Sequence, residues 1–207
     1  MTPAMPSYAQ LLDPVGEDST DARILDAALE LFAELGISRV GIEDIARRAK
    51  INRATVYRRI GAKDEIVRAA VLREVSRFLD RMAARLRAID DAPQRIIDGF
   101  ALTLTELREH PILRKTLAVD REHTLATITV DAAASLALVT EFVAREILAV
   151  RPGQHRDDTV DVTAAMIVRL IHSLVLIPDA PPQLRTRADM RDFAARHLVP
   201  LIGPATP

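Results

Sequence analysis

The sequence contains no cysteine and no tryptophan, and only two tyrosines. The lack of cysteine excludes disulfide bonds, thiolate chemistry and zinc sites with cysteine ligands. The five histidines show no metal-ligand spacing, and there is no HExxH, glycine-rich phosphate loop or G-x-S-x-G motif. We therefore expect no catalytic residues, no metal, no cofactor and no enzymatic activity.

Long apolar runs are also missing. The most apolar segment, residues 166–177, has 12 residues and includes Arg169 and His172, so we expect it to be too short to span a membrane. The N-terminus has no basic segment followed by a long apolar run, as a signal peptide would. A cytoplasmic protein without a membrane partner is expected.

Hydrophobic residues make up 49% of the chain and charged residues 28%, as in soluble globular proteins. Apolar residues recur at helical spacing, and no segment shows the alternation of a strand. The fold class predicted is all-α. The pattern indicates about nine helices, near residues 20–35, 42–49, 53–60, 63–88, 92–109, 112–119, 124–150, 158–177 and 186–198.

Residues 42–63 predict two short helices joined by a tight turn. Ala46 on the first helix is small enough for the second to cross closely, and Asn52 is a good N-cap for the second. Val56 and Ile60 lie four residues apart and should point inward. The opposite face is small, hydroxylic, aromatic and basic, which suits a groove of DNA. It carries Arg53, Ala54, Thr55, Tyr57 and Arg58.

Positive charge is concentrated in this motif. The whole chain has 28 basic and 29 acidic residues, yet residues 47–63 include no acidic one. Such a cluster is what phosphate binding requires. A solvated basic helix pair that does not bind DNA is the alternative. The basic residues are Arg47, Arg48, Lys50, Arg53, Arg58, Arg59 and Lys63.

Residues 23–66 resemble the DNA-binding domain of the TetR family of transcriptional regulators. The matching stretches are ILDAALELFAELG (24–36), IEDIARRA (42–49), NRATVYRRI (52–60) and AKDEI (62–66). The resemblance implies that Arg53, Thr55, Tyr57 and Arg58 face DNA and that Lys63 holds a phosphate. To this set we add Arg48, Lys50 and Ala54.

Two positions depart from the family pattern. Lys50 stands where the family usually has glycine, so a residue with a side chain is expected to adopt a positive φ there. Gly41 stands where a threonine or serine usually caps the first helix of the motif, so that hydroxyl contact is expected to be missing.

Three domains are expected. Residues 1–19 contain three prolines and no lysine or arginine, which is typical of a disordered leader without a basic arm. Residues 20–66 form the helix-turn-helix DNA-binding domain. Residues 67–207 form an effector-binding and dimerisation domain.

The helix predicted over 158–177 is apolar at nine of the twelve positions from 166 onward. A helix that is apolar on nearly every side must be covered on nearly every side. We expect a second subunit to supply the cover, with two helices from each subunit forming a four-helix bundle, as the resemblance also implies. Burial within one subunit is the alternative. The expected interface residues are Met166, Leu170, Leu174, Met190, Phe193 and Leu198.

The resemblance implies a ligand cavity in the second domain. The candidates for its lining are mostly aliphatic, with no acidic–aromatic cage, so a small apolar effector is expected, oriented by a few polar groups. His172 is either a core or interface histidine or a polar contact to this effector. The expected effector residues are Phe78, Met82, Leu86, Phe100, Thr103, Leu104, Leu138, Phe142 and His172.

The favoured function is a homodimeric repressor that binds an inverted repeat in double-stranded operator DNA and is released by a small apolar effector. An all-helical protein–protein adaptor is the alternative, and the basic, acid-free motif argues against it. An all-helical enzyme is disfavoured because no nucleophile–base pair and no metal set is present.

Overall fold

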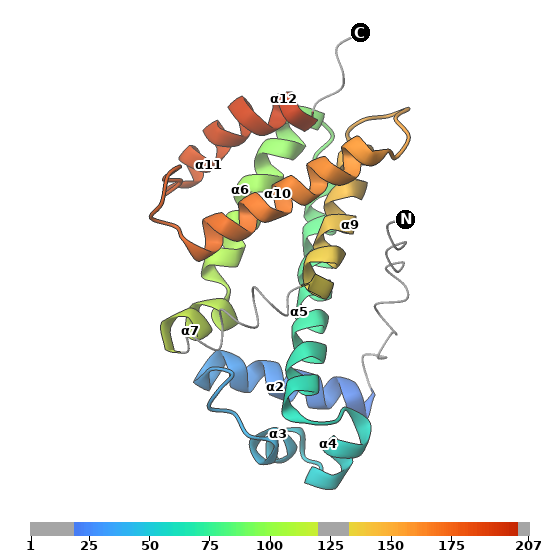
Figure 1. Ribbon diagram of the computed structural model, residues 1–207, viewed down its shortest axis with the longest axis vertical. Coiled ribbons are helices and arrows are strands. Elements are labelled where there is room, and N and C mark those ends of the chain that lie inside the picture. The colour runs from blue at the N-terminus through green and yellow to red at the C-terminus, as the bar shows by residue number, and fades with distance from the viewer. Residues whose placement is uncertain (1–18, 120–132, 203–207) are drawn as a thin grey trace. The chain divides into compact units, whose positions relative to one another are not determined.

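The computed structural model describes residues 19–119 and 133–202 (Figure 1). In these ranges the chain forms nine continuous helices and no strand, which confirms the all-α prediction. The leader expected over residues 1–19 lies outside the described residues except for Ser19, and so does the start of the helix predicted over 124–150.

The helices agree closely with the predicted ranges. The last helix is continuous and contains one π-helical turn, η2, between α11 and α12. In chain order the elements are α2 (Thr20–Leu35), α3 (Ile42–Ala49), α4 (Arg53–Arg59), α5 (Lys63–Leu86), α6 (Ala92–Glu109), α7 (Pro111–Val119), α9 (Ala133–Ala149), α10 (Asp158–Leu176), α11 (Arg187–Phe193), η2 (Ala194–Leu198) and α12 (Val199–Ile202).

Capping side chains start several of these helices. Ser19 accepts from the backbone N–H of Ala22 at the start of α2, and Asp91 accepts from that of Gln94 at the start of α6. A third capping side chain starts α10. Asp157 accepts from the N–H of Val160 at 2.9 Å, because Asp158 is already the first helical residue.

The chain divides into two compact units. The first comprises residues 1–77 and 111–138, and the second comprises residues 78–110 and 139–207. In the first unit α2 packs on α3 and α7 around a core that includes Phe32, Ile45, Val56 and Ile66. In the second unit α6 packs on α10, α11 and η2. The domain boundaries expected from the sequence stay a prediction.

Helix α10 is 19 residues long and, by length and composition alone, apolar enough to cross a membrane. The sequence reasoning counted only residues 166–177, whereas the helix begins at Asp158. Core helices of soluble proteins meet the same criterion. Here Val160, Ala164, Ile167 and Leu174 are buried in the core of the second unit.

Lys50 ends α3 in the left-handed conformation, with φ 56° and ψ 45°, as its position in the motif predicted. Its N–H bonds to the carbonyl of Arg47, and the N–H of Ile51 bonds to that of Ala46. These two hydrogen bonds end α3, and the left-handed residue turns the chain toward α4. A residue with a Cβ pays a steric cost for that conformation, whereas glycine does not.

We therefore expect Lys50→Gly to raise the free energy of unfolding by about 1 kcal/mol. Urea denaturation followed by circular dichroism measures this change. Lys50→Ala is the matched control, because it removes the same charge but keeps the Cβ. Equal stability of the glycine and alanine variants would show that the positive φ carries no cost.

Candidate functional site

Helix α4 presents one face to the core and the other to solvent. Val56 is fully buried and Ile60 half-buried, whereas Arg53, Tyr57 and Arg58 are exposed. Asn52 caps the helix through its side-chain oxygen, which accepts from the N–H of Thr55 at 2.7 Å. The two faces are therefore oriented as the sequence predicted. Ala54 is exposed with the basic residues, and Thr55 is half-buried.

Arg53 is held in place on the exposed face by two neighbours. Its Nη1 lies 2.8 Å from Oε1 of Glu43 at the start of α3, and its Nη2 donates to the hydroxyl of Tyr57 at 3.3 Å. The guanidinium also stacks over the Tyr57 ring, 5.4 Å from its centroid. The hydrogen bond to Tyr57 and the charge of Glu43 raise the pKa of Arg53. Sequence reasoning missed Glu43, which lies ten residues from its partner.

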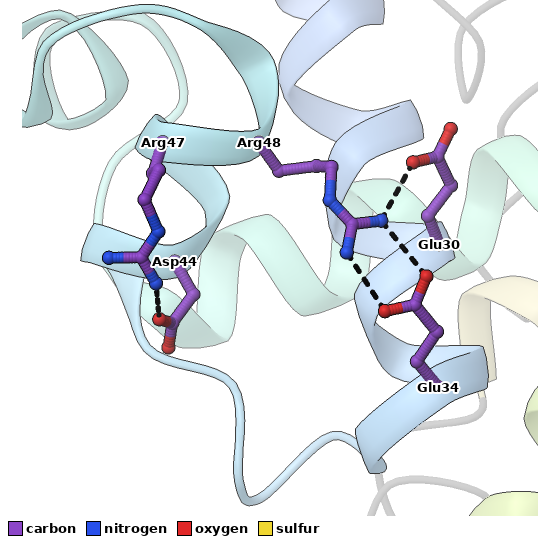
Figure 2. A network of polar contacts seen from close by, with 5 residues as sticks. All are labelled: Glu30, Glu34, Asp44, Arg47 and Arg48. Atoms are coloured by element: carbon purple, nitrogen blue, oxygen red, sulfur yellow. Dashed lines mark hydrogen bonds and ion pairs between the residues drawn. The ribbon is translucent and has the colours of Figure 1, made fainter.

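Arg48 reaches across to α2 (Figure 2). Its guanidinium donates to Glu30 at 3.0 Å and to both carboxylate oxygens of Glu34 at 2.8 and 3.0 Å. These bonds lower the pKa of Glu34, mainly through the side-chain hydrogen bond from Arg48. Arg48 was expected to bind DNA, and in the structure its charge is satisfied by two carboxylates. These bonds tie α3 to α2, and a DNA contact of Arg48 stays a prediction.

The start of α3 lacks a hydroxyl cap, as expected at Gly41. The Asp44 side chain supplies another contact, since its Oδ2 accepts from the N–H of Gly41 at 3.0 Å. That backbone bond, together with the ion pair to Arg47 in Figure 2, lowers the pKa of Asp44. The helix start is therefore ordered without the hydroxyl.

The remaining expected DNA-binding cations are arranged differently. Lys63 donates to the carbonyl of Ser38 at 2.9 Å, in the loop between α2 and α3. Arg58 donates only weakly to the Thr55 hydroxyl, at 3.4 Å. Lys50 is exposed at the turn. A contact that the sequence did not suggest is Arg23, which donates to the carbonyl of Ala49 at 2.7 Å and so fixes the end of α3.

A family model described as "Bacterial regulatory proteins, tetR family" matches residues 24–70. An uncharacterized HTH-type transcriptional regulator of Mycobacterium tuberculosis is 28% identical over 186 residues, which cover 89% of this chain and 86% of that one. Residues 24–70 therefore match the DNA-binding domain of the TetR family, and over most of its length the chain is similar to an HTH-type transcriptional regulator.

Solved structures show that the fold of this regulator is shared. The TetR family repressor AlkX from Dietzia sp., implicated in biodegradation of n-alkanes, superposes with a TM-score of 0.69 at 19% identity over 90% of this chain and 99% of that one. RolR in complex with resorcinol gives 0.61 at 16% identity, over 89% and 88% of the two chains. The regulator therefore has the fold of these proteins.

The second unit of the regulator contains a cavity. Four of the nine expected effector residues line it: Leu86, Phe100, Thr103 and Phe142. Phe78, Met82, Leu104 and Leu138 are buried but do not line it, and His172 is half-buried elsewhere. The polar lining residues Arg95 and Glu146 were not foreseen.

The expected interface residues fall into two groups. Leu174, Met190 and Leu198 are buried in the core of the second unit, because they pack with α6 within the same chain. Met166 is 56% exposed, and Leu170 and Phe193 are half-buried. Sequence reasoning did not single out Val162, which is 58% exposed one helical turn before Met166.

In the described residues, no group of three or more His, Cys, Asp or Glu side chains is placed to hold a metal ion. The charged contacts of the motif are instead ion pairs between basic and acidic side chains. A DNA phosphate that binds one of these basic side chains would compete with the carboxylate that already pairs with it.

Glu43→Gln is expected to strengthen binding to non-operator DNA by roughly two- to fivefold, because Arg53 then loses its competing carboxylate. The slope of log K against log salt should also become steeper, since one more cation reaches a phosphate. Fluorescence anisotropy with random duplexes at several salt concentrations measures both quantities.

Asp64→Asn is the matched control, because it removes an exposed charge from the first turn of α5, where no basic partner side chain is recorded among the described residues. It should reproduce only the general effect of one lost negative charge. Equal gains in the two variants would contradict a specific role for the Glu43–Arg53 pair.

Proposed function

We propose that the regulator is a homodimeric repressor that binds an inverted repeat in double-stranded DNA and leaves it when a small apolar effector binds. The observation that carries this proposal is the exposed face of α4. Arg53, Tyr57 and Arg58 lie together on a helix whose other face is fixed by the burial of Val56. We place the activity in the cytoplasm, with no membrane partner and no catalytic role.

On that face the residues can act in different ways. Arg58 and Arg53 can bond a guanine edge bidentately, while Ala54 and Thr55 are small enough to allow close approach to the bases. The ammonium groups of Lys63 and Lys50 can contact DNA phosphates. Such contacts would position the helix on the DNA but would not distinguish one base sequence from another. Arg48 stays in the proposed set only as a support, since Glu30 and Glu34 hold it.

The homodimer is supported by the exposed side of α10. Val162 and Met166 are 58% and 56% exposed, and their spacing of one helical turn places them on one stripe of α10. Ile177, which caps the end of the helix, is 59% exposed. Large exposed apolar stripes mark interaction sites. A second copy that presents the same stripe across a two-fold axis would cover it.

Release by an effector is supported by the cavity in the second unit and by relatives of the same fold, one of which was crystallised with resorcinol. The ligand must bind the DNA-free arrangement of the dimer more tightly than the DNA-bound arrangement, because otherwise it does not change the fraction of dimer that is bound to DNA. The adaptor alternative has no DNA-binding step, so the assay below decides between the two.

Selection from random DNA should yield an inverted repeat with half-sites about one helical turn apart. Against that operator, Arg58→Ala and Tyr57→Ala are each expected to cost about 1–3 kcal/mol of binding free energy. Lys63→Ala should instead weaken binding to all sequences alike and flatten the salt dependence. Unchanged operator affinity in both α4 variants, or no enrichment of any sequence, would remove the basis for the proposal.

The double substitution Val162→Glu with Met166→Glu should give a monomer of 22.8 kDa in sedimentation while its helical circular dichroism is kept. Both side chains are exposed in the single chain, so the two introduced carboxylates should destabilise the dimer interface and not the fold of the protomer. Leu174→Glu is the contrasting variant, because its charge is buried in the protomer core and should lower Tm sharply. A wild type that sediments as a monomer would refute the dimer.

A further inference from the structure

The cavity of the second unit has a volume of about 90 Å³. It is lined by the end of α5 and by residues of α6, α9, α10 and the last helix, all of which belong to the second unit. Most of the lining side chains are aliphatic or aromatic. The main contributors are Ile96, Phe100, Phe142, Ile147, Ile167 and Leu198.

Gly99 lines this cavity from the interior of α6. Glycine is less favourable than alanine inside a helix, because it loses more conformational freedom on folding. Gly99 has no positive φ, so the backbone conformation does not require a glycine there. Packing supplies the reason, since a Cβ atom at this position would lie 3.0 Å from Cδ2 of Leu86.

Leu86 is the residue of α5 that closes over Gly99. Its side chain is only 6% exposed, and it also lines the cavity. Carbon atoms that are not bonded pack best at about 3.5–4.0 Å, so a contact of 3.0 Å is too close. A methyl group therefore cannot be added at position 99 unless Leu86, a part of the cavity wall, moves.

The charged groups of the wall are already bonded to each other. Arg95 of α6 donates through Nη2 to Oε2 of Glu146 on α9 at 2.6 Å, and the pair balances its own charge. Nε of Arg95 has less than 1 Å² of accessible surface, so a ligand in the cavity does not reach it. The hydroxyl of Thr103 is directed at the sulfur of Met82, at 3.9 Å.

We propose that the contact between Gly99 and Leu86 sets the size of this cavity, and that the cavity binds a compact, uncharged hydrocarbon ring through its apolar surface alone. The inference deepens the proposed function and rests on it in one respect, namely that this molecule is the effector. It assigns Gly99 and Leu86 as residues that determine ligand specificity.

Charge and hydration favour a ligand without a polar head group. A carboxylate or an ammonium group would be a further charge beside the balanced pair of Arg95 and Glu146. A neutral oxygen would lose its hydration and would have to compete for donors with the carboxylate of Glu146. A hydrocarbon loses no hydrogen bond when it leaves water, and burial of its surface is favourable.

Volume favours a single small ring. A dry cavity of about 150 Å³ binds benzene, so one of about 90 Å³ accepts a molecule of that size or smaller. This narrows the small apolar effector expected from the sequence to a compact one. A ligand with two fused rings exceeds the space that Leu86 and Gly99 leave.

The test uses the full-length chain with labelled isoleucine methyl groups. Ile96, Ile147 and Ile167 line the cavity, so their NMR signals report binding there. Ile24 and Ile45 in the core of the first unit serve as internal references. Four ligands are titrated up to their solubility in water: cyclopentane, tetrahydrofuran, cyclopentanol and indane. Tetrahydrofuran replaces one CH₂ group of cyclopentane by oxygen at nearly the same volume, and indane adds a second ring.

We expect cyclopentane to shift the cavity methyl groups and to bind at least tenfold more tightly than tetrahydrofuran or cyclopentanol. Indane should bind at least tenfold more weakly than cyclopentane, because it does not fit. Tetrahydrofuran or cyclopentanol that binds as tightly as cyclopentane would overturn the proposal by showing a polar contact. Equal affinity for indane, or shifts confined to the reference methyl groups, would also overturn it.

Two variants test the residues that set the size. Leu86→Ala should strengthen the binding of indane at least tenfold, because the missing side chain leaves space. Gly99→Ala should weaken the binding of cyclopentane at least fivefold, because the new methyl group overlaps with Leu86. The double variant should regain cyclopentane binding, since the methyl group at position 99 no longer meets Cδ2. Unchanged cyclopentane affinity in Gly99→Ala would show that Gly99 does not set the size.

Asp80→Ala is the matched control, because it also introduces a better helix former in the second unit. Asp80 is exposed on α5, the helix of Leu86, and does not line the cavity. This variant should keep the wild-type affinities for all four ligands. If Leu86→Ala fails to fold by circular dichroism, the ligand series on the wild type and on Gly99→Ala decides.

Operator binding is measured separately from ligand binding. Ligand binding in the expected order without any DNA binding would refute the proposed function and leave this assignment standing. DNA binding together with no shift of the cavity methyl groups by any ligand would overturn this assignment alone.

Discussion

The burial of Val56 is the constraint on which the proposed DNA-binding surface depends. Val56 is fully buried in the first core, and Asn52 fixes the start of α4 one turn earlier. Because a helix turns 100° per residue, these two positions determine the direction of every other side chain of α4. Arg53, Tyr57 and Arg58 are exposed for that reason, whatever their own interactions. The left-handed turn at Lys50 sets the angle at which α4 leaves α3.

Much of the positive charge of the motif is already engaged within the chain. Arg48 is held by Glu30 and Glu34, Arg47 by Asp44, and Arg53 by Glu43. The basic run found in the sequence is acid-free only along the chain, because α2 and the first turn of α3 supply the acids in space. In the proposed complex, binding of Arg53 to a phosphate would therefore replace its ion pair with Glu43, and the gain in free energy would be smaller than the count of basic residues suggests.

The helices and the faces of α4 could be predicted because they depend on local rules. Apolar spacing, the caps Ser19, Asn52 and Asp91, and the position of Lys50 are all readable within a few residues of sequence. The burial of the expected interface residues within one chain was only partly predictable. An apolar pattern shows that Met166 and Leu174 are both hydrophobic, but not that one is exposed and the other packs on α6.

The pairing of Arg95 with Glu146 lies beyond sequence reasoning, since 51 residues separate the partners and neither belongs to a motif. The same holds for Glu43 with Arg53 and for Arg48 with α2. Such pairs depend on how helices are packed, and periodicity does not encode the identity of the neighbouring helix. The aliphatic character of the cavity could be foreseen from composition, whereas its polar contact could not.

The exposed position of Tyr57 has an optical consequence. The chain has no tryptophan, and its other tyrosine, Tyr8, precedes the described residues. Among the described residues, tyrosine fluorescence therefore comes from a single ring, which lies on the exposed face of α4 and stacks on Arg53. Any event that changes the stacking or hydration of that face alters the fluorescence of the native protein without a label. In a Tyr8→Phe background, the single remaining phenol becomes a local reporter of the exposed face of α4.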